Sequence, residues 1–154
     1  MSELVTVIDL KETKGRILGV DFGDTRTGLA VSDASRFLAS GIGYVSPGGI
    51  EKTADKVAEV AKEQRASAVV VGLPKNMDGS EGPRADVVKA FAELLAEQTA
   101  IPIDFYDERM TTMVAYRYLG ETGTFGKKRR EAVDTLSAEL ILQSYIDRER
   151  ASRG

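Results

Sequence analysis

Residues 17–33 read ILGVDFGDTRTGLAVSD, in which two apolar runs are joined by a short connection rich in Gly and Thr. This pattern predicts a β-hairpin. Asp21 stands at the end of the first run, after four apolar residues, where a carboxylate is costly unless a positive group meets it. Two interpretations of Asp21 stay open: a turn aspartate that caps its own loop, or a ligand for a metal ion or a phosphate-associated cation.

The composition narrows the chemistry that the chain can perform. It contains no Cys and no His, which excludes most zinc sites, every Ser–His triad and every Cys nucleophile. Carboxylates, Lys, Arg, Tyr and hydroxyl groups remain. Because carboxylate oxygens prefer hard cations, Mg²⁺ or Mn²⁺ is the cofactor that this composition favours.

Length and hydropathy predict one domain. With 154 residues, we expect a single domain at 16–150, a polar N-terminal extension at 1–15 and a C-terminal tail at 151–154. No apolar run is long enough to span a bilayer, and residues 1–15 are too polar for a signal peptide. Without Cys for disulfides, we expect a cytoplasmic protein with no membrane partner.

The charge is unevenly distributed along the chain. A net charge of −3 argues against a general nucleic-acid binder, yet residues 116–154 carry a positive surplus. That surplus is concentrated in Lys127, Lys128, Arg129 and Arg130. Such a run can be an ordinary solvated face or a surface that binds phosphates, and both interpretations stay open at this point.

Hydrophobic periodicity predicts three closely spaced strands followed by alternating helices and strands. The predicted strands are 16–22, 28–32, 37–45, 68–73 and 101–106, and the predicted helices are 50–65, 84–98, 111–119 and 129–148. This order is typical of an α/β fold with a mixed five-stranded sheet, in which a three-strand antiparallel meander is extended by two parallel strands, and with helices on both faces. Right-handed crossovers make the first, fourth and fifth strands parallel.

This topology brings distant acids together. Ligands of such sheets bind beyond the carboxyl ends of the parallel strands, where Asp21 and Glu108 stand. Helical spacing places Asp134 on the same face as Ala138 and Ile141, although it could simply complement the helix dipole. Three close carboxylates repel one another unless a proton or a divalent cation intervenes. We therefore expect a metal site of the kind that activates water against a phosphodiester. The basic run lies just before Asp134, so phosphate binding becomes its favoured role.

Four segments, 19–33, 72–84, 107–112 and 133–143, stand in an order that resembles the YqgF/RuvX family. Members of that family are relatives of Holliday junction resolvases, have an RNase H-like fold and are described as pre-16S rRNA nucleases. The resemblance implies that Asp21, Glu108 and Asp134 are the catalytic, metal-binding acids. It also implies that Arg26, Arg109 and the run Lys127, Lys128, Arg129 and Arg130 contact or orient nucleic acid.

The resemblance implies a divalent-metal-dependent endonuclease that processes the 5′ end of the 16S ribosomal RNA precursor in ribosome biogenesis. In that reaction, water attacks the phosphodiester in line and a 3′ oxygen leaves. Three alternatives stay open: resolution of branched DNA, a non-catalytic nucleic-acid-binding or transcription-associated module, and a nucleotide-binding domain of the actin and sugar-kinase kind. Monomer and homodimer are both compatible with the sequence, although a resolvase needs two paired active sites.

Smaller roles follow from local chemistry. Backbone geometry is the expected role of Gly72, Gly79 and Gly82. We expect the polar residues Asn76, Asp78 and Ser80 to cap the following helix or to line the site, with capping favoured. A structural role is expected for Asp33 and Asp104. Arg26 could neutralise Asp21 or Asp24, and Arg109 could pair with Asp107 or with the sheet edge.

Overall fold

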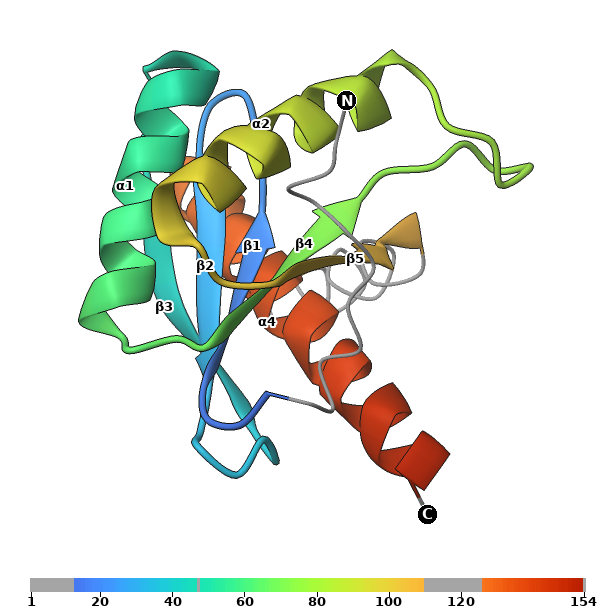
Figure 1. The fold of residues 1–154 in the computed structure, drawn as a ribbon. Helices are drawn as coiled ribbons and strands as arrows, with labels where there is room; N and C mark the ends of the chain where they lie inside the picture. Colours follow the sequence, from blue (N-terminus) through green and yellow to red (C-terminus); the bar gives the residue numbers. More distant parts are fainter. Residues whose placement is uncertain (1–12, 47, 110–125, 154) are drawn as a thin grey trace.

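A five-stranded sheet forms the centre of the molecule (Figure 1). The structure, a computed structural model, describes residues 13–46, 48–109 and 126–153, and for 126–134 and 153 it describes the backbone alone. The described elements are β1 (Ile17–Asp21), β2 (Thr27–Ser32), β3 (Ala39–Val45), α1 (Gly49–Glu63), β4 (Ala68–Leu73), α2 (Pro83–Thr99), β5 (Ile103–Asp107) and α4 (Gly126–Arg153). No helix in these ranges is long and apolar enough to cross a membrane.

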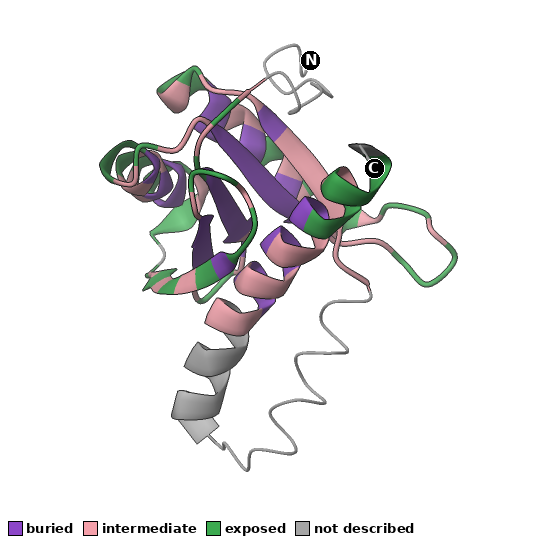
Figure 2. Cartoon of the chain, turned by 90° about the horizontal axis from the view of Figure 1, so that it is seen from below, coloured by how far each residue is buried: buried purple, intermediate pink, exposed green. Residues whose placement is uncertain are grey.

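The predicted topology is confirmed. The strand order is β3-β2-β1-β4-β5, with antiparallel pairing in β1–β2 and β2–β3 and parallel pairing in β1–β4 and β4–β5. Helices α1 and α2 pack on one face of the sheet and α4 packs on the other, so both faces are covered (Figures 1 and 2). The carboxyl ends of β1, β4 and β5 therefore lie at one edge of the sheet.

Strand β4 explains why both faces are covered. All six of its residues are buried, as a continuous apolar run predicts. Val69 and Val71 face the α1/α2 layer, whereas Ala68 and Val70 face α4. The alternation places one half of the core on each side of the sheet.

Helix α4 approaches the sheet closely because three strands present glycine to it. A Cβ atom on Gly41 would lie 2.4 Å from Thr135 Cγ2, one on Gly19 would lie 2.8 Å from Leu142 Cβ, and one on Gly72 would lie 2.6 Å from Ile141 Cδ1. Contacts under 3.0 Å are sterically prohibited. The helix thus crosses from β3 through β1 to β4, in a path that side chains at these positions would block.

Several strand boundaries differ from the prediction by one or two residues, and two of them have a clear local reason. Strand β3 begins at Ala39 and not at Phe37, because the N–H groups of Phe37 and Leu38 donate to Asp33 Oδ1 at 2.8 and 2.9 Å and close a loop instead. Those bonds confirm Asp33 as structural. Strand β5 begins at Ile103, since Pro102 has no N–H to donate to a ladder.

The ends of the chain also differ in part from the prediction. Helix α4 is longer than the predicted 129–148 at both ends. The predicted helix 111–119 and residues 1–12 lie outside the described residues. Of the predicted loose extension, Thr13 and Gly15 are fixed to the domain, since Arg36 Nη2 donates to Thr13 Oγ1 at 2.8 Å and Arg36 Nε donates to the Gly15 carbonyl at 2.7 Å.

The close approach of α4 makes a testable prediction. We expect Gly19→Ala to lower the free energy of unfolding by about 1–3 kcal/mol, because the new methyl group overlaps Leu142 and the carbonyl of Ala138. Ser40→Ala, at an exposed neighbouring position on β3, should change it by less than about 0.5 kcal/mol. Urea unfolding with unchanged m-values measures both, and equal stability of the two variants would contradict the packing described here.

Candidate active site

Asp21 closes β1 on the face of the sheet that α4 covers. Its neighbour Val20 packs in the α1/α2 layer, whereas Gly19 faces Leu142 of α4. Because side chains alternate along a strand, Asp21 points to the same face as Gly19. It pairs with Gly28 of β2, at the carboxyl end of the parallel strands. The predicted position of Asp21 is thus confirmed.

Glu108 reaches Asp21 from the other side of β4. It follows β5 directly, and its N–H donates to the Leu73 carbonyl at 3.3 Å. Its carboxyl group is hydrogen-bonded to the carboxyl group of Asp21. A Cβ atom on Gly72 would lie 2.6 Å from Glu108 Oε2, so glycine at this position provides the space for the carboxylate. Gly72 is therefore needed for this close approach and not for a left-handed backbone conformation. Gly79, in contrast, has a positive φ of 90°, as its predicted role in backbone geometry requires.

The electrostatics of the two adjacent acids differ. Burial raises the pKa of Glu108, an effect that the hydrogen bond to Asp21 and the charge of Arg84 oppose and that the charge of Asp107 reinforces. The hydrogen bond from Arg109 lowers the pKa of Asp107.

Two carboxyl groups can bond to each other only when one of them carries a proton. Two adjacent carboxylates repel each other unless a proton or a cation lies between them, so the Asp21–Glu108 pair marks a place where a cation could bind.

Arg84 is a cation whose charge acts on Glu108, and sequence reasoning assigned it no role. It lies in the first turn of α2, where Nη1 contacts Asp24 Oδ1 at 2.7 Å and Nη2 donates to the Phe22 carbonyl at 3.1 Å. Its guanidinium also stacks 5.4 Å from the centre of the Phe22 ring. The described ion pair of Asp24 is with Arg84. The roles predicted for Arg26, neutralising Asp21 or Asp24, stay predictions.

Arg109 fixes the loop after β4 to the end of β5. Its Nη2 lies 2.6 Å from Asp107 Oδ2, which confirms the predicted pairing. Its Nη1 donates to the carbonyls of Asn76 and Met77, each at 3.4 Å. Half of this guanidinium thus bonds Asp107, next to Glu108, and the other half bonds the loop at 74–82. Arg109 thus holds the loop at 74–82 against the end of β5, next to Glu108.

The polar residues of that loop bond to one another and do not cap α2. Asn76 Nδ2 donates to Ser80 Oγ at 3.0 Å, and the Ser80 N–H and hydroxyl donate to Asp78 Oδ1 at 2.9 and 2.6 Å. The N-cap of α2 is Gly82, which has no side chain to cap with, and Pro83 follows it. The favoured capping role was wrong because a Gly-Pro start leaves the capping position to the backbone.

The remaining predicted site residues lie at the start of α4. The helix places Asp134 one turn before Ala138, whose carbonyl is among the atoms nearest to Gly19. The side chains of Asp134 and of the run 127–130 are outside the part that the structure describes, so their roles stay predictions. Among the described side chains, no three metal-ligating residues cluster. Ala138, Ile141 and Tyr145 are buried, as the predicted helix face requires.

The described pair fits a divalent metal ion. Asp21 and Glu108 offer only oxygen donors, which suit Mg²⁺ and Mn²⁺ and do not suit soft metals. Two carboxyl groups that lie close together concentrate negative charge at this point. Asp104, by contrast, accepts a hydrogen bond from the Tyr145 hydroxyl at 3.0 Å and is structural, as predicted.

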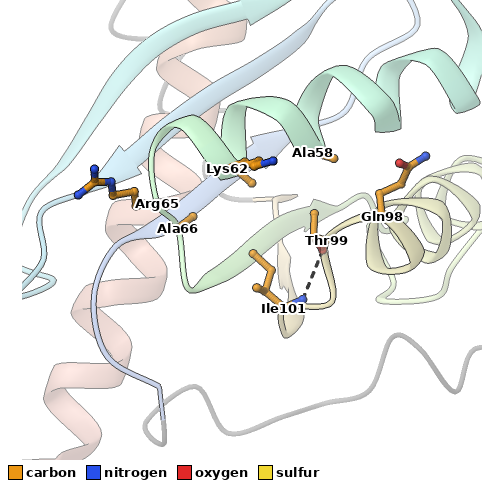
Figure 3. A pocket seen from close by; sticks show the side chains of 8 residues that line it. Ala58, Lys62, Arg65, Ala66, Gln98, Thr99 and Ile101 are labelled. Atoms are coloured by element: carbon orange, nitrogen blue, oxygen red, sulfur yellow. Dashed lines mark hydrogen bonds between the residues drawn. The ribbon is translucent and has the colours of Figure 1, made fainter.

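The structure also contains a pocket of about 360 Å³ between the ends of α1 and α2 (Figure 3). It is lined by residues such as Ala66 and Ile101, which precede β4 and β5. It therefore lies at the amino ends of the parallel strands, opposite to Asp21 and Glu108. The acid pair stands outside this pocket.

Comparisons with known proteins identify the family of the chain. Residues 15–148 match the family model described as "RuvX: Holliday junction resolvase". A protein of Ligilactobacillus salivarius, named "Putative pre-16S rRNA nuclease", is 44% identical over 136 residues, which cover 86% of this chain and 92% of that protein.

Two solved structures show the same fold at low sequence identity. RuvC of T. thermophilus, solved in complex with a Holliday junction substrate, has a TM-score of 0.51 and 20% identity, with 91% of this chain and 96% of that chain covered. The human cytomegalovirus terminase nuclease domain, soaked with Mn and bound to an inhibitor, has a TM-score of 0.52 and 14% identity, with 99% and 91% covered. These likenesses place the sheet and its helices in the RNase H-like fold.

The buried acid makes a prediction about stability. In metal-free buffer at about pH 8, we expect Glu108→Gln to raise Tm. The pKa of Glu108 is raised in the folded state, so the wild-type protein loses stability as the pH rises through that pKa. Gln keeps the neutral form at every pH. The gain should vanish below about pH 4, where Glu108 is protonated in both the folded and the unfolded state.

Glu59→Gln, at an exposed position in the middle of α1, is the matched control and should leave Tm unchanged. Thermal unfolding followed by circular dichroism over this pH range measures the difference. An unchanged or lower Tm for Glu108→Gln near the alkaline end would contradict the burial of charge at this position.

Proposed function

The chain belongs to the RuvX family and is a nuclease with an RNase H-like fold, and we propose that it hydrolyses precursor 16S ribosomal RNA at the site formed by Asp21 and Glu108. Relatives that are 44% and 43% identical to it carry the name "Putative pre-16S rRNA nuclease". The family name and the resolvase neighbours favour branched DNA as the second candidate substrate. In both cases the reaction is hydrolysis of a phosphodiester bond.

One observation carries the proposal: Asp21 at the end of β1 and Glu108 directly after β5 lie next to each other at the carboxyl edge of the sheet, where burial raises the pKa of Glu108. Such a pair is costly to maintain in a protein that does not use it. With Asp134 as the third ligand, the acids would hold Mg²⁺ or Mn²⁺, the ions that the oxygen donors favour. Mn in the viral terminase nuclease domain, which shares this fold, supports the assignment.

Each residue around the pair has a role in this reaction. Asp21, Glu108 and Asp134 would bind the metal, which when bound activates water and stabilises charge on the phosphate. Arg84 lowers the pKa of Glu108 and so favours its ionised, metal-binding form. Arg109 positions the loop at 74–82 through its bonds to Asp107 and to that loop.

We propose that Arg26 and the run Lys127, Lys128, Arg129 and Arg130 contact the phosphate backbone of the substrate. Positive charge supplies most of the affinity for nucleic acid without regard to sequence. The location in the cytoplasm and the choice between monomer and homodimer stay predictions. A stable dimer would favour junction resolution, because two strands of a junction are cut in a paired manner.

The central experiment compares wild type with Asp21→Asn on two substrates, a structured precursor rRNA fragment and a four-way DNA junction, with Mg²⁺ or Mn²⁺. We expect wild type to cleave the RNA and Asp21→Asn to lose activity by more than the roughly 10–100-fold that loss of an outer-shell partner costs, since Asp21 would bind the metal directly. Gel analysis of labelled substrates measures the rates.

Asp86→Asn removes an exposed acid in the first turn of α2 and is the matched control, which should retain wild-type rates. Preferential cleavage of the junction would replace RNA by branched DNA as the substrate. Equal activity of wild type and Asp21→Asn, or a lack of cleavage of either substrate, would overturn the assignment of the site.

A further inference from the structure

An exposed aromatic side chain lies level with Asp21 on the same sheet. Asp21 of β1 pairs with Gly28 of β2, and Gly28 pairs with Tyr44 of β3. Directly opposed residues of antiparallel strands share a face, so Tyr44 points to the face that Asp21 occupies. Two strand spacings of about 4.8 Å separate them, or about 10 Å.

A β-bulge is what turns Tyr44 to this face. Leu29 pairs with Gly43 and Ala30 pairs with Gly41, so Ile42 is an extra residue in β3. Without it, alternation from Gly41, which faces α4, would direct Tyr44 to the α1/α2 layer. Bulges commonly redirect a side chain beside an active site. Val45, next to Tyr44, packs against the α1/α2 core and confirms the shift.

Arg26 gives this aromatic side chain a positive neighbour. Its guanidinium carbon lies 5.4 Å from the centre of the Tyr44 ring, within the range of a cation–π contact. The Tyr44 residue remains 38% exposed. An exposed ring beside an arginine, on the face of the sheet that holds the acid pair, combines the two features by which proteins bind single-stranded nucleic acid.

We propose that Tyr44, with Arg26 beside it, is a stacking platform for a base of the substrate strand, about three stacked nucleotides from the phosphate at Asp21. That count follows from about 10 Å between Tyr44 and Asp21 and about 3.4 Å per nucleotide in a stacked strand. The platform deepens the proposed function and rests on it for the identity of the substrate. The base stacks on the ring while the Arg26 charge attracts the adjoining phosphate.

Phe37 supplies a matched control for this proposal. It is also an exposed aromatic residue, at 54%, and Arg150 lies 3.8 Å from the centre of its ring. It precedes β3, at the end of the strand remote from Asp21, since β3 runs toward the carboxyl edge that holds Tyr44. Both aromatic residues thus have an arginine partner, but Tyr44 alone of the two lies level with the acid pair.

The test measures binding without cleavage, in EDTA, with the full chain and a 12-nucleotide single-stranded RNA that carries one 2-aminopurine. Fluorescence anisotropy gives Kd, and quenching of 2-aminopurine reports stacking. We expect Tyr44→Ala to weaken binding about 5- to 150-fold, the equivalent of one stacked base. Tyr44→Leu should resemble Tyr44→Ala, whereas Tyr44→Phe and Phe37→Ala should bind within about twofold of wild type.

Thermal unfolding of each variant shows whether the fold is kept, and Tyr44→Phe and Tyr44→Leu separate loss of the ring from loss of bulk. Wild-type affinity and quenching in Tyr44→Ala, or equal loss in Tyr44→Ala and Phe37→Ala, would overturn the platform. Cleavage is scored separately with metal present. If Tyr44→Ala binds the RNA normally and cleavage persists, the platform is refuted and the proposed function stands. If binding depends on Tyr44 but no cleavage occurs, the proposed nuclease substrate is refuted and the platform stands.

Discussion

The close contact between α4 and the sheet is the constraint on which the site depends. Gly41, Gly19 and Gly72 carry no side chain at the points where the strands come closest to the helix. The helix can therefore cross from β3 to β4, with Thr135 beside β3 and Ala138 beside β1. The same lack of a Cβ atom at position 72 admits the Glu108 carboxylate. Packing and chemistry thus depend on the same glycine positions.

Charge at this edge is arranged so that two neighbouring acids behave differently. Asp107 bonds Arg109, which lowers its pKa, whereas burial raises the pKa of Glu108. Arg84 faces Glu108 from α2 and limits that rise. The result is one acid that is ion-paired with Arg109 and one whose ionisation is disfavoured by burial. Separation of pKa values between close acids is typical of catalytic sites.

The sequence was sufficient for the topology and for the positions of Asp21 and Glu108 at the carboxyl edge of the sheet, because apolar periodicity and right-handed crossovers determine where strands end. It did not reveal the role of Arg84 beside Glu108, since a basic residue after Pro83 looks like any exposed residue in the first turn of a helix. The capping role predicted for Asn76 and Ser80 was wrong because side chains in a turn can hydrogen-bond one another as readily as they bond the N–H groups of a helix. Tyr44 depends on a one-residue bulge, and no periodicity predicts which residue of a strand is extra.

The most direct test of the account is the position of Mn²⁺ by anomalous diffraction from crystals soaked with the ion. We predict a peak within about 2.3 Å of carboxylate oxygens from both Asp21 and Glu108, with Asp134 as a further ligand. A peak elsewhere, or the absence of any peak between Asp21 and Glu108 at saturating Mn²⁺, would contradict the claim that these acids form a metal site.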